Sequence, residues 1–188
     1  MHTGDLETRE RTTLASIYQR LSTGGGLLPN SISFVLDLEA RKGQDVKELQ
    51  RRTGKRVFFT EGVRMIENLF LEPTLISTFL LEVCADWLEG AVVRSSAEEI
   101  AAHWDELQDA KRYAIDFART ADPQRWRAEV HGGHVLEDTV TALTDARLRY
   151  RKVEHGRRLA ELCLAHDRAS LLEPVVRTLK AALDLSAD

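Results

Sequence analysis

Apolar residues recur along this chain at spacings of three and four positions, which is the period of an amphipathic α-helix. The first such segment covers residues 6–21 and ends before three consecutive glycines at 24–26. The later segments predicted to be helical are 32–40, 45–52, 60–71, 73–93, 96–120, 123–126, 136–153 and 170–183. The pattern of 136–153 continues past Gly156 with Leu159, Leu162 and Cys163. The pattern therefore predicts an all-α fold, a compact multi-helix bundle of about eight to ten helices with no significant sheet.

Residues at the ends of these segments support the assignment. Glu72 and Pro73 begin the most apolar helix, because proline suits the first helical turn. A capping box, in which each side chain accepts from a free backbone N–H at the helix start, is possible in two registers, Ser95 with Glu98 or Ser96 with Glu99. The only run with strand character is 56–59, Arg-Val-Phe-Phe.

The last helix is predicted to begin after a Ser170 cap, with Pro174 in its first turn. Its apolar positions Val175, Leu179 and Leu183 are expected to face inward.

The glycine run divides the chain into two predicted parts. Residues 1–26 would form an N-terminal helix and a glycine joint, and residues 27–188 would form a single helical domain. A chain of 188 residues is long enough for one core of this kind.

Composition limits the classes of protein and the cellular location that fit this sequence. Residues 73–93 contain three acidic residues, which argues against a membrane span. No secretory signal is visible, so the cytoplasm is the predicted location. Cys84 and Cys163 lie in apolar helical patterns and are expected to be reduced and buried. A net charge of -4 disfavours generic binding to polyanions, although local basic surfaces remain.

One basic segment has a recognisable spacing. Leu49, Thr53 and Gly54 within residues 46–69 resemble the helix-turn-helix fingerprint of bacterial DNA-binding regulators. The resemblance implies a second helix that enters the major groove of DNA. The basic residues offered for a partner or a nucleic acid in this region are Lys47, Arg51, Arg52, Lys55 and Arg56.

A second basic surface is predicted along residues 147–158. Arg147, Arg151, His155 and Arg158 would fall on one side of a continuous helix, where they could follow a phosphate backbone or an acidic protein surface.

Metal and catalytic motifs are weak. His131 and His134 flank a glycine pair, while Cys163 and His166 are three residues apart, but these spacings match no usual zinc site. We therefore predict no metal, no cofactor and no catalytic residue. A helical enzyme or metal protein assembled from dispersed residues such as His155 stays a third hypothesis.

Phe58 and Phe59 are candidate interface residues because aromatic side chains near short loops often anchor protein contacts. The function predicted from the sequence is a non-enzymatic helical interaction or assembly module, a subunit or accessory factor of a larger complex. It would bind a protein partner, a second copy included. The alternative is a DNA- or RNA-associated regulator that uses residues 46–69 or 147–158.

Overall fold

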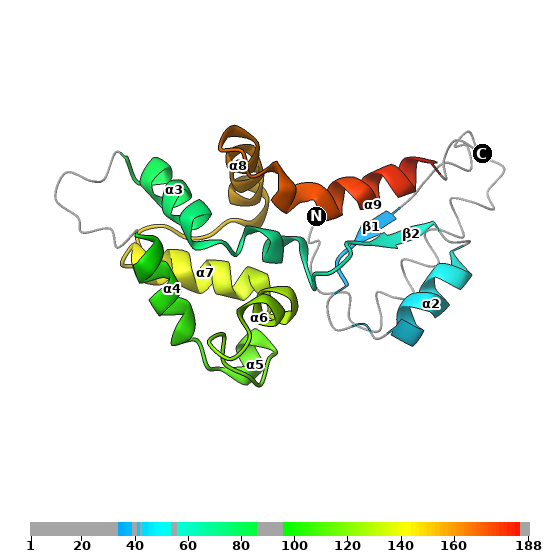
Figure 1. The fold of residues 1–188 in the computed structure, drawn as a ribbon, viewed down its shortest axis with the longest axis horizontal. Helices are drawn as coiled ribbons and strands as arrows, with labels where there is room; N and C mark the ends of the chain where they lie inside the picture. Colours follow the sequence, from blue (N-terminus) through cyan, green and yellow to red (C-terminus); the bar gives the residue numbers. More distant parts are fainter. Residues whose placement is uncertain (1–33, 39–40, 42, 54–55, 86–95, 185–188) are drawn as a thin grey trace. The chain divides into compact units, whose positions relative to one another are not determined.

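The structure of this protein, a computed structural model, describes residues 34–38, 41, 43–53, 56–85 and 96–184. Within these ranges the chain forms eight α-helices, two 3-10 helices and two short strands (Figure 1). The all-α fold predicted from the sequence is confirmed. The predicted helix over residues 6–21 and the glycine joint lie outside the described residues. In chain order the elements are β1 (Phe34–Leu36), α2 (Gly43–Arg52), β2 (Val57–Phe59), η1 (Ile66–Phe70), α3 (Pro73–Val83), α4 (Ala97–Asp105), α5 (Ala110–Tyr113), α6 (Pro123–Glu129), α7 (Gly132–Leu143), α8 (Lys152–Ala165), η3 (Ala169–Leu172) and α9 (Glu173–Asp184).

The described residues group into two compact units. The first contains those up to Phe59 together with those from Arg177 onward, and the second runs from Thr60 to Val176. Helix α9 begins in the second unit and continues in the first. The single domain predicted over residues 27–188 stays a prediction.

The first unit contains a two-stranded parallel sheet. Strands β1 and β2 pair in a register that sets Phe34 against Val57 and Leu36 against Phe59. Helix α2 connects them, as a parallel pair requires a crossover. The strand predicted at 56–59 is confirmed, but the helix predicted over 32–40 is wrong, because residues 34–36 form a strand. Aromatic and β-branched residues suit a half-buried strand, and the pairing with β2 outweighs the helical spacing.

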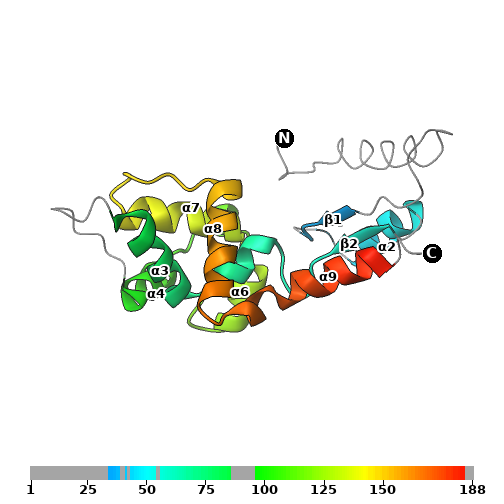
Figure 2. The same cartoon turned by 90° about the horizontal axis from the view of Figure 1, so that it is seen from above.

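Helix α9 lies beside this sheet in both views (Figures 1 and 2). The Thr178 hydroxyl is 3.5 Å from the carbonyl oxygen of Phe59, to which it donates. Thr178 and Ala182 are buried. The side of α9 that packs against β2 therefore contains the small residues Thr178 and Ala182.

The second unit holds the main hydrophobic core. Helix α3 packs against α4 and α8, and α4 packs against α7 (Figure 2). The indole rings of Trp104 and Trp126 lie in the centre of this core with their centroids 5.9 Å apart. The Trp104 Nε1–H donates to the Thr139 hydroxyl at 2.8 Å, so this buried indole N–H is satisfied. Other fully buried members are Leu75, Ile76, Phe79, Leu80, Ile100, Val130, Leu136, Leu159 and Leu162.

Two helices, α3 and α4, begin where the sequence predicts them to begin. The Glu72 carboxylate accepts from the backbone N–H of Leu75 at 2.8 Å, and Pro73 occupies the first turn of α3. Ser96 and Glu99 form the reciprocal hydrogen bonds of a capping box at the start of α4. Both predictions are confirmed.

Two predicted helices are shorter than expected. The helix predicted to continue to residue 120 ends at Asp105, because the Asp109 carboxylate caps a new short helix, α5. Helix α5 ends at Ala114, whose φ of 58° is left-handed. The helix predicted over 60–71 is reduced to the 3-10 helix η1.

Asn68 connects η1 to α6 and α7. Its Nδ2 donates to the carbonyl oxygens of Arg127 at 2.7 Å and of Val130 at 2.8 Å. The backbone of Gly132 passes so close that a Cβ there would lie 2.7 Å from the Asn68 Oδ1. Gly132 is therefore the first residue of α7, whereas the sequence pattern predicts that the glycine pair 132–133 separates two helices.

The long helix predicted over 136–153 is also wrong, because α7 ends at Leu143 and α8 begins at Lys152. The Thr144 hydroxyl donates to the Val140 carbonyl and accepts from the backbone N–H of Leu148. Asp145 and the residue after it then take left-handed backbone angles. These local hydrogen bonds end α7 although the apolar spacing continues.

Among the described residues no helix combines the length and the apolar character that crossing a bilayer requires. Cys84 and Cys163 are free and buried, as predicted.

Candidate interaction surfaces

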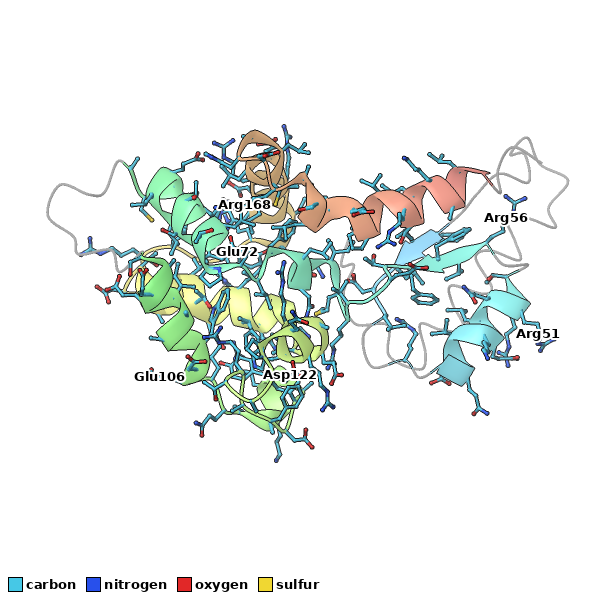
Figure 3. The ribbon with its side chains drawn as sticks, viewed as in Figure 1. Arg51, Arg56, Glu72, Glu106, Asp122 and Arg168 are labelled. Atoms are coloured by element: carbon cyan, nitrogen blue, oxygen red, sulfur yellow. The ribbon has the colours of Figure 1, made fainter. Side chains whose placement is uncertain are left out.

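The basic residues of α2 lie on the exposed side of that helix. Lys47, Arg51 and Arg52 are exposed (Figure 3 labels Arg51). The Glu48 carboxylate accepts from the Arg51 Nε at 2.9 Å and from the Arg52 Nε at 2.7 Å. Hydrogen bonds from Arg51 and Arg52 lower the pKa of Glu48 to about 2. Two of the three cations therefore share one acidic partner, which reduces the positive field of this surface.

Residues 46–69 do not form the helix pair of a helix-turn-helix. The chain leaves α2 and enters strand β2 over Val57–Phe59, and the next helical element is the short η1. The apolar sequence of the connection explains this difference, since Phe58 and Phe59 pair with β1 and do not form a polar turn. Arg56 is half-buried, and Lys55 lies outside the described residues.

Phe58 and Phe59 are half-buried residues of β2. The guanidinium of Arg41 lies 5.8 Å from the centre of the Phe59 ring, within range of a cation–π contact. Part of each phenylalanine stays accessible, and their use as an interface remains a prediction.

The continuous basic face predicted over 147–158 is not present as one helical surface. Arg147 lies in the connection after α7, and Arg151 immediately precedes α8. His155 is buried, with its ring centroid 5.3 Å from that of Phe79. Burial lowers the pKa of His155, which favours the neutral ring. The four predicted residues thus do not share one exposed face, and whether any of them binds a partner is a separate question.

Several arginines of this region already have acidic partners. The Arg151 Nη1 lies 3.0 Å from the Glu154 carboxylate. Arg158 bridges two helices, because it pairs with Glu82 of α3 and with Glu161 of its own helix. Of these pairs, Arg158–Glu82 joins α3 to α8, and the other two are local to α8.

An ion pair between an exposed lysine and a buried glutamate joins the start of α8 to η1. The Lys152 ammonium lies 2.8 Å from the Glu67 Oε1, and Glu67 is buried in η1. Burial, together with the negative charge of Glu67, raises the pKa of Tyr150. This cluster joins the connection before α8 to η1.

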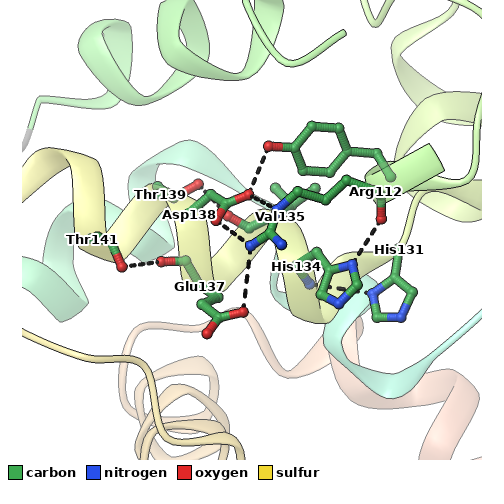
Figure 4. Close-up of polar contacts among 9 residues, drawn as sticks. Arg112, His131, His134, Val135, Glu137, Asp138, Thr139 and Thr141 are labelled. Carbon is green, nitrogen blue, oxygen red and sulfur yellow. Dashed lines mark hydrogen bonds and ion pairs between the residues drawn. The ribbon is translucent and has the colours of Figure 1, made fainter. Parts of the chain in front are cut away.

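A second polar cluster joins α5 to α7 (Figure 4). The Arg112 guanidinium donates to both oxygens of the Asp138 carboxylate, and the Tyr113 hydroxyl donates to the same carboxylate at 2.7 Å. Burial acts to raise the pKa of Asp138, but the hydrogen bonds from Arg112 and Tyr113 outweigh it, so the pKa is lowered. Burial and the Asp138 contact raise the pKa of Tyr113 to about 12. The cluster is thus an ionised carboxylate held by two donors.

His131 and His134 stack at the first turn of α7, with ring centroids 3.8 Å apart and planes at 12° (Figure 4). The His134 Nδ1 lies 2.7 Å from the Arg112 carbonyl oxygen, so it carries the proton and donates. The His131 Nδ1 accepts from the His134 backbone N–H at 3.3 Å. A metal bound by both rings would have to lie in both ring planes, and stacked planes do not share such a position.

Cys163 and His166, the second pair of possible metal ligands, do not form a site either. Cys163 is buried, while His166 is exposed at the end of α8. Within the described parts of the chain no three His, Cys, Asp or Glu residues form a cluster able to hold a metal ion.

Helix α9 presents the surface that sequence reasoning missed. Leu179 and Leu183 were expected to face inward, but they are 46% and 68% exposed, and Val176 is 43% exposed. The sequence pattern correctly marks an apolar face, yet only its edge, Thr178 and Ala182, is covered. We name Val176, Leu179 and Leu183 the α9 seam.

The sequence contains one signal for the α9 seam, which is the order of small and large residues along the helix. Residues four apart, Thr178 and Ala182, are small, while their neighbours on the apolar side are large. The small residues Thr178 and Ala182 allow α9 to approach strand β2 closely. The larger apolar side chains next to them on α9 stay exposed.

Comparisons of this chain with protein families, with curated proteins and with solved structures find no match.

Proposed function

We propose that this protein is a non-enzymatic interaction or assembly module that binds a protein partner through the α9 seam. The observation that carries the proposal is the exposure of Val176, Leu179 and Leu183 along one side of a twelve-residue helix. Exposed apolar side chains gathered on one face favour association, because covering them removes apolar area from water.

The spacing of the seam supports a protein partner. Its members are three and four residues apart, which places them in one stripe along the helix. Such a stripe fits into a groove or against another helix, a common mode of recognition between proteins. Burying it would contribute about 25 cal/mol for each Å² of apolar area covered.

The polar clusters of the second unit support a scaffold role. Arg112 and Asp138 join α5 to α7, Lys152 and Glu67 join α8 to η1, and Arg168 lies 3.6 Å from Glu72 at the start of α3 (Figure 3). Their charged groups pair with one another across elements, as expected for contacts that fix a fold.

A nucleic-acid partner is the second candidate. Arg147 and Arg149 are exposed in the connection between α7 and α8, and exposed arginines suit phosphate groups. Binding to a labelled duplex or single strand that weakens steeply with salt would support it. No binding at low salt would exclude it. The cytoplasm stays the predicted location, supported by the two free, buried thiols.

The test of the main proposal is affinity capture of the tagged full chain from its native lysate, with nuclease present. The Leu179→Ser/Leu183→Ser variant is expected to lose a protein partner that the unmodified chain retains. Leu164→Ser is the matched control, because Leu164 of α8 is 66% exposed and is not part of the α9 seam.

Equal recovery of the partner by the double variant and by the unmodified chain would contradict the proposal. Recovery that depends on nucleic acid would instead favour the second candidate.

A further inference from the structure

We infer that His131 and His134, stacked at the start of α7, form a pH-sensitive contact that holds α7 to α5 while His131 is neutral and loosens when His131 takes up a proton. The inference concerns the second unit alone and is independent of the α9 seam. It uses three observations: the hydrogen bond that the His131 ring accepts, the helix end at which this ring lies, and the links from both histidines to α5.

The ring of His131 caps α7 as a hydrogen-bond acceptor. Its Nδ1 lies 3.3 Å from the backbone nitrogen of His134, whose N–H is shared with the His131 carbonyl oxygen at 3.0 Å. A ring nitrogen that accepts a hydrogen bond carries no proton, so this geometry requires the neutral ring. A protonated His131 would set its own ring N–H against the N–H of His134, and the ring would have to turn away.

The position at the helix end acts in the same direction. Helix α7 has twelve residues, and His131 is its N-cap. The free N–H groups of the first turn make a helix N-terminus the positive end of the helix dipole, where a cation is disfavoured. The cap and the dipole therefore both favour the uncharged ring of His131.

Both histidines are tied to the last two residues of α5. The His134 Nδ1 donates to the Arg112 carbonyl oxygen at 2.7 Å, which fixes the ring on which His131 stacks at a centroid distance of 3.8 Å (Figure 4). The backbone N–H of His131 donates to the Tyr113 carbonyl oxygen at 2.8 Å. Turning the His131 ring would remove the stack and weaken the hold of α5 on the first turn of α7.

Several acidic side chains of α7 and of its neighbouring elements already have cationic partners. The pairs are Glu137 and Asp138 with Arg112, Glu67 of η1 with Lys152, Asp105 of α4 with Arg119, and Glu129 of α6 with Arg125. The other titratable residues on these elements are Glu98, Glu99, His103, Lys111, Tyr113 and Arg127. Arg64 adds a positive charge near the end of α6, because its Nη1 donates to the Glu129 carbonyl oxygen at 3.4 Å. A carboxylate paired with a cation attracts a proton on a nearby ring less strongly, so these groups leave the effect of the cap and the dipole in place.

The contact is expected to respond in the range in which histidine side chains exchange protons, about pH 5 to 8. At the upper end His131 is neutral, and the cap, the stack and both links to α5 are present. At the lower end the ring turns, and the first turn of α7 loosens from α5. The ion pair between Arg112 and Asp138 still joins the two helices there, so acid changes this contact without unfolding the unit.

The test is NMR spectroscopy of the nitrogen-labelled full chain at both ends of this pH range. At the upper end the His131 ring is expected to carry its proton on Nε2 and none on Nδ1, which the ring nitrogen shifts distinguish. At the lower end the protection of the His134 amide against hydrogen exchange, corrected for the intrinsic rate, is expected to be about tenfold smaller, as for the loss of one hydrogen bond.

His131→Asn separates capping from titration, because an asparagine side chain accepts as an N-cap but does not take up a proton. This variant is expected to keep the protection of the His134 amide at the upper pH and to lose its fall in acid. His166→Asn is the matched control, since His166 is exposed at the end of α8. It is expected to leave the fall unchanged.

A proton on the His131 Nδ1 at the upper pH would overturn the inference, and this measurement needs no substitution. Protection of the His134 amide that stays constant with pH would overturn it as well, as would a His131→Asn chain that keeps the full response to acid. The capture experiment with the α9 variant bears on the proposed function alone.

Discussion

Helices α7 and α9 have the same length of twelve residues and similar apolar patterns, but the fold uses them differently. Helix α7 buries Val135, Leu136, Val140 and Leu143 in the core of the second unit. Helix α9 buries the small residues Thr178 and Ala182 and leaves Val176, Leu179 and Leu183 exposed.

The difference shows that helical periodicity identifies an apolar face without identifying what covers it. For α7 the cover is supplied by α4 and by neighbouring elements of the same unit. For α9 the described residues cover only one edge. A face that is incompletely covered within its own chain is a candidate for covering by another molecule.

The largest expected difference in stability is between two leucine-to-alanine variants, one in α7 and one in α9. Leu136→Ala should lower the free energy of unfolding by about 2–5 kcal/mol, because Leu136 is fully buried and a cavity remains. Leu179→Ala should lower it by less than about 1 kcal/mol, since half of that side chain is already exposed.

Urea unfolding followed by circular dichroism at low protein concentration measures both values, because association contributes little there. Similar losses for the two variants would show that the α9 seam is part of a core after all.

An intermediate effect is expected at the start of α7. Gly132→Ala should cost about 1–3 kcal/mol, because the added Cβ would lie 2.8 Å from the Asn68 backbone nitrogen. Gly133→Ala is the matched control, since its Cβ would come no closer than 3.6 Å to the His131 ring. Its effect should stay within about 0.5 kcal/mol. Thermal unfolding followed by tryptophan fluorescence compares them, and equal melting temperatures would contradict the close approach.

The smallest effect concerns the polar side of α7. Because the folded pKa of Asp138 lies below its usual value of 3.8, its ionised form stabilises the fold above that pH. Asp138→Asn should therefore cost about 1 kcal/mol near neutral pH. The cost should shrink as the pH falls through the lowered pKa. Urea unfolding of both proteins between pH 7 and pH 3 measures it, and a cost that does not change with pH would argue against a stabilising ion pair.

Features that depend on a few neighbouring residues could be predicted from the sequence. The Glu72 and Ser96 caps act on N–H groups within three positions of themselves, so the residue order contains the whole interaction. The burial of Cys84 and Cys163 also followed from their place within apolar patterns.

Features that depend on distant partners could not be predicted in this way. Strand β1 was taken for a helix, because its strand state depends on pairing with β2 more than twenty residues further along. The end of α7 depends on the Thr144 hydroxyl, which competes with a helical pattern that continues past it.

In the candidate surfaces, too, local features could be predicted from the sequence, whereas features that depend on distant contacts could not. Lys47, Arg51 and Arg52 are exposed on α2, as a polar helical face predicts. The pairing of Arg51 and Arg52 with Glu48 depends on side-chain geometry. The α9 seam could be recognised as apolar, whereas its exposure depends on how closely Thr178 approaches Phe59.

The two buried cysteines have a practical consequence. Burial raises the pKa of Cys84 and of Cys163, and both thiols belong to the second unit. Iodoacetamide in solution reacts with thiolates that it reaches, so labelling has to wait until this interior opens. The alkylation rate of the unmodified chain therefore reports how often the second unit opens, without any added probe or substitution.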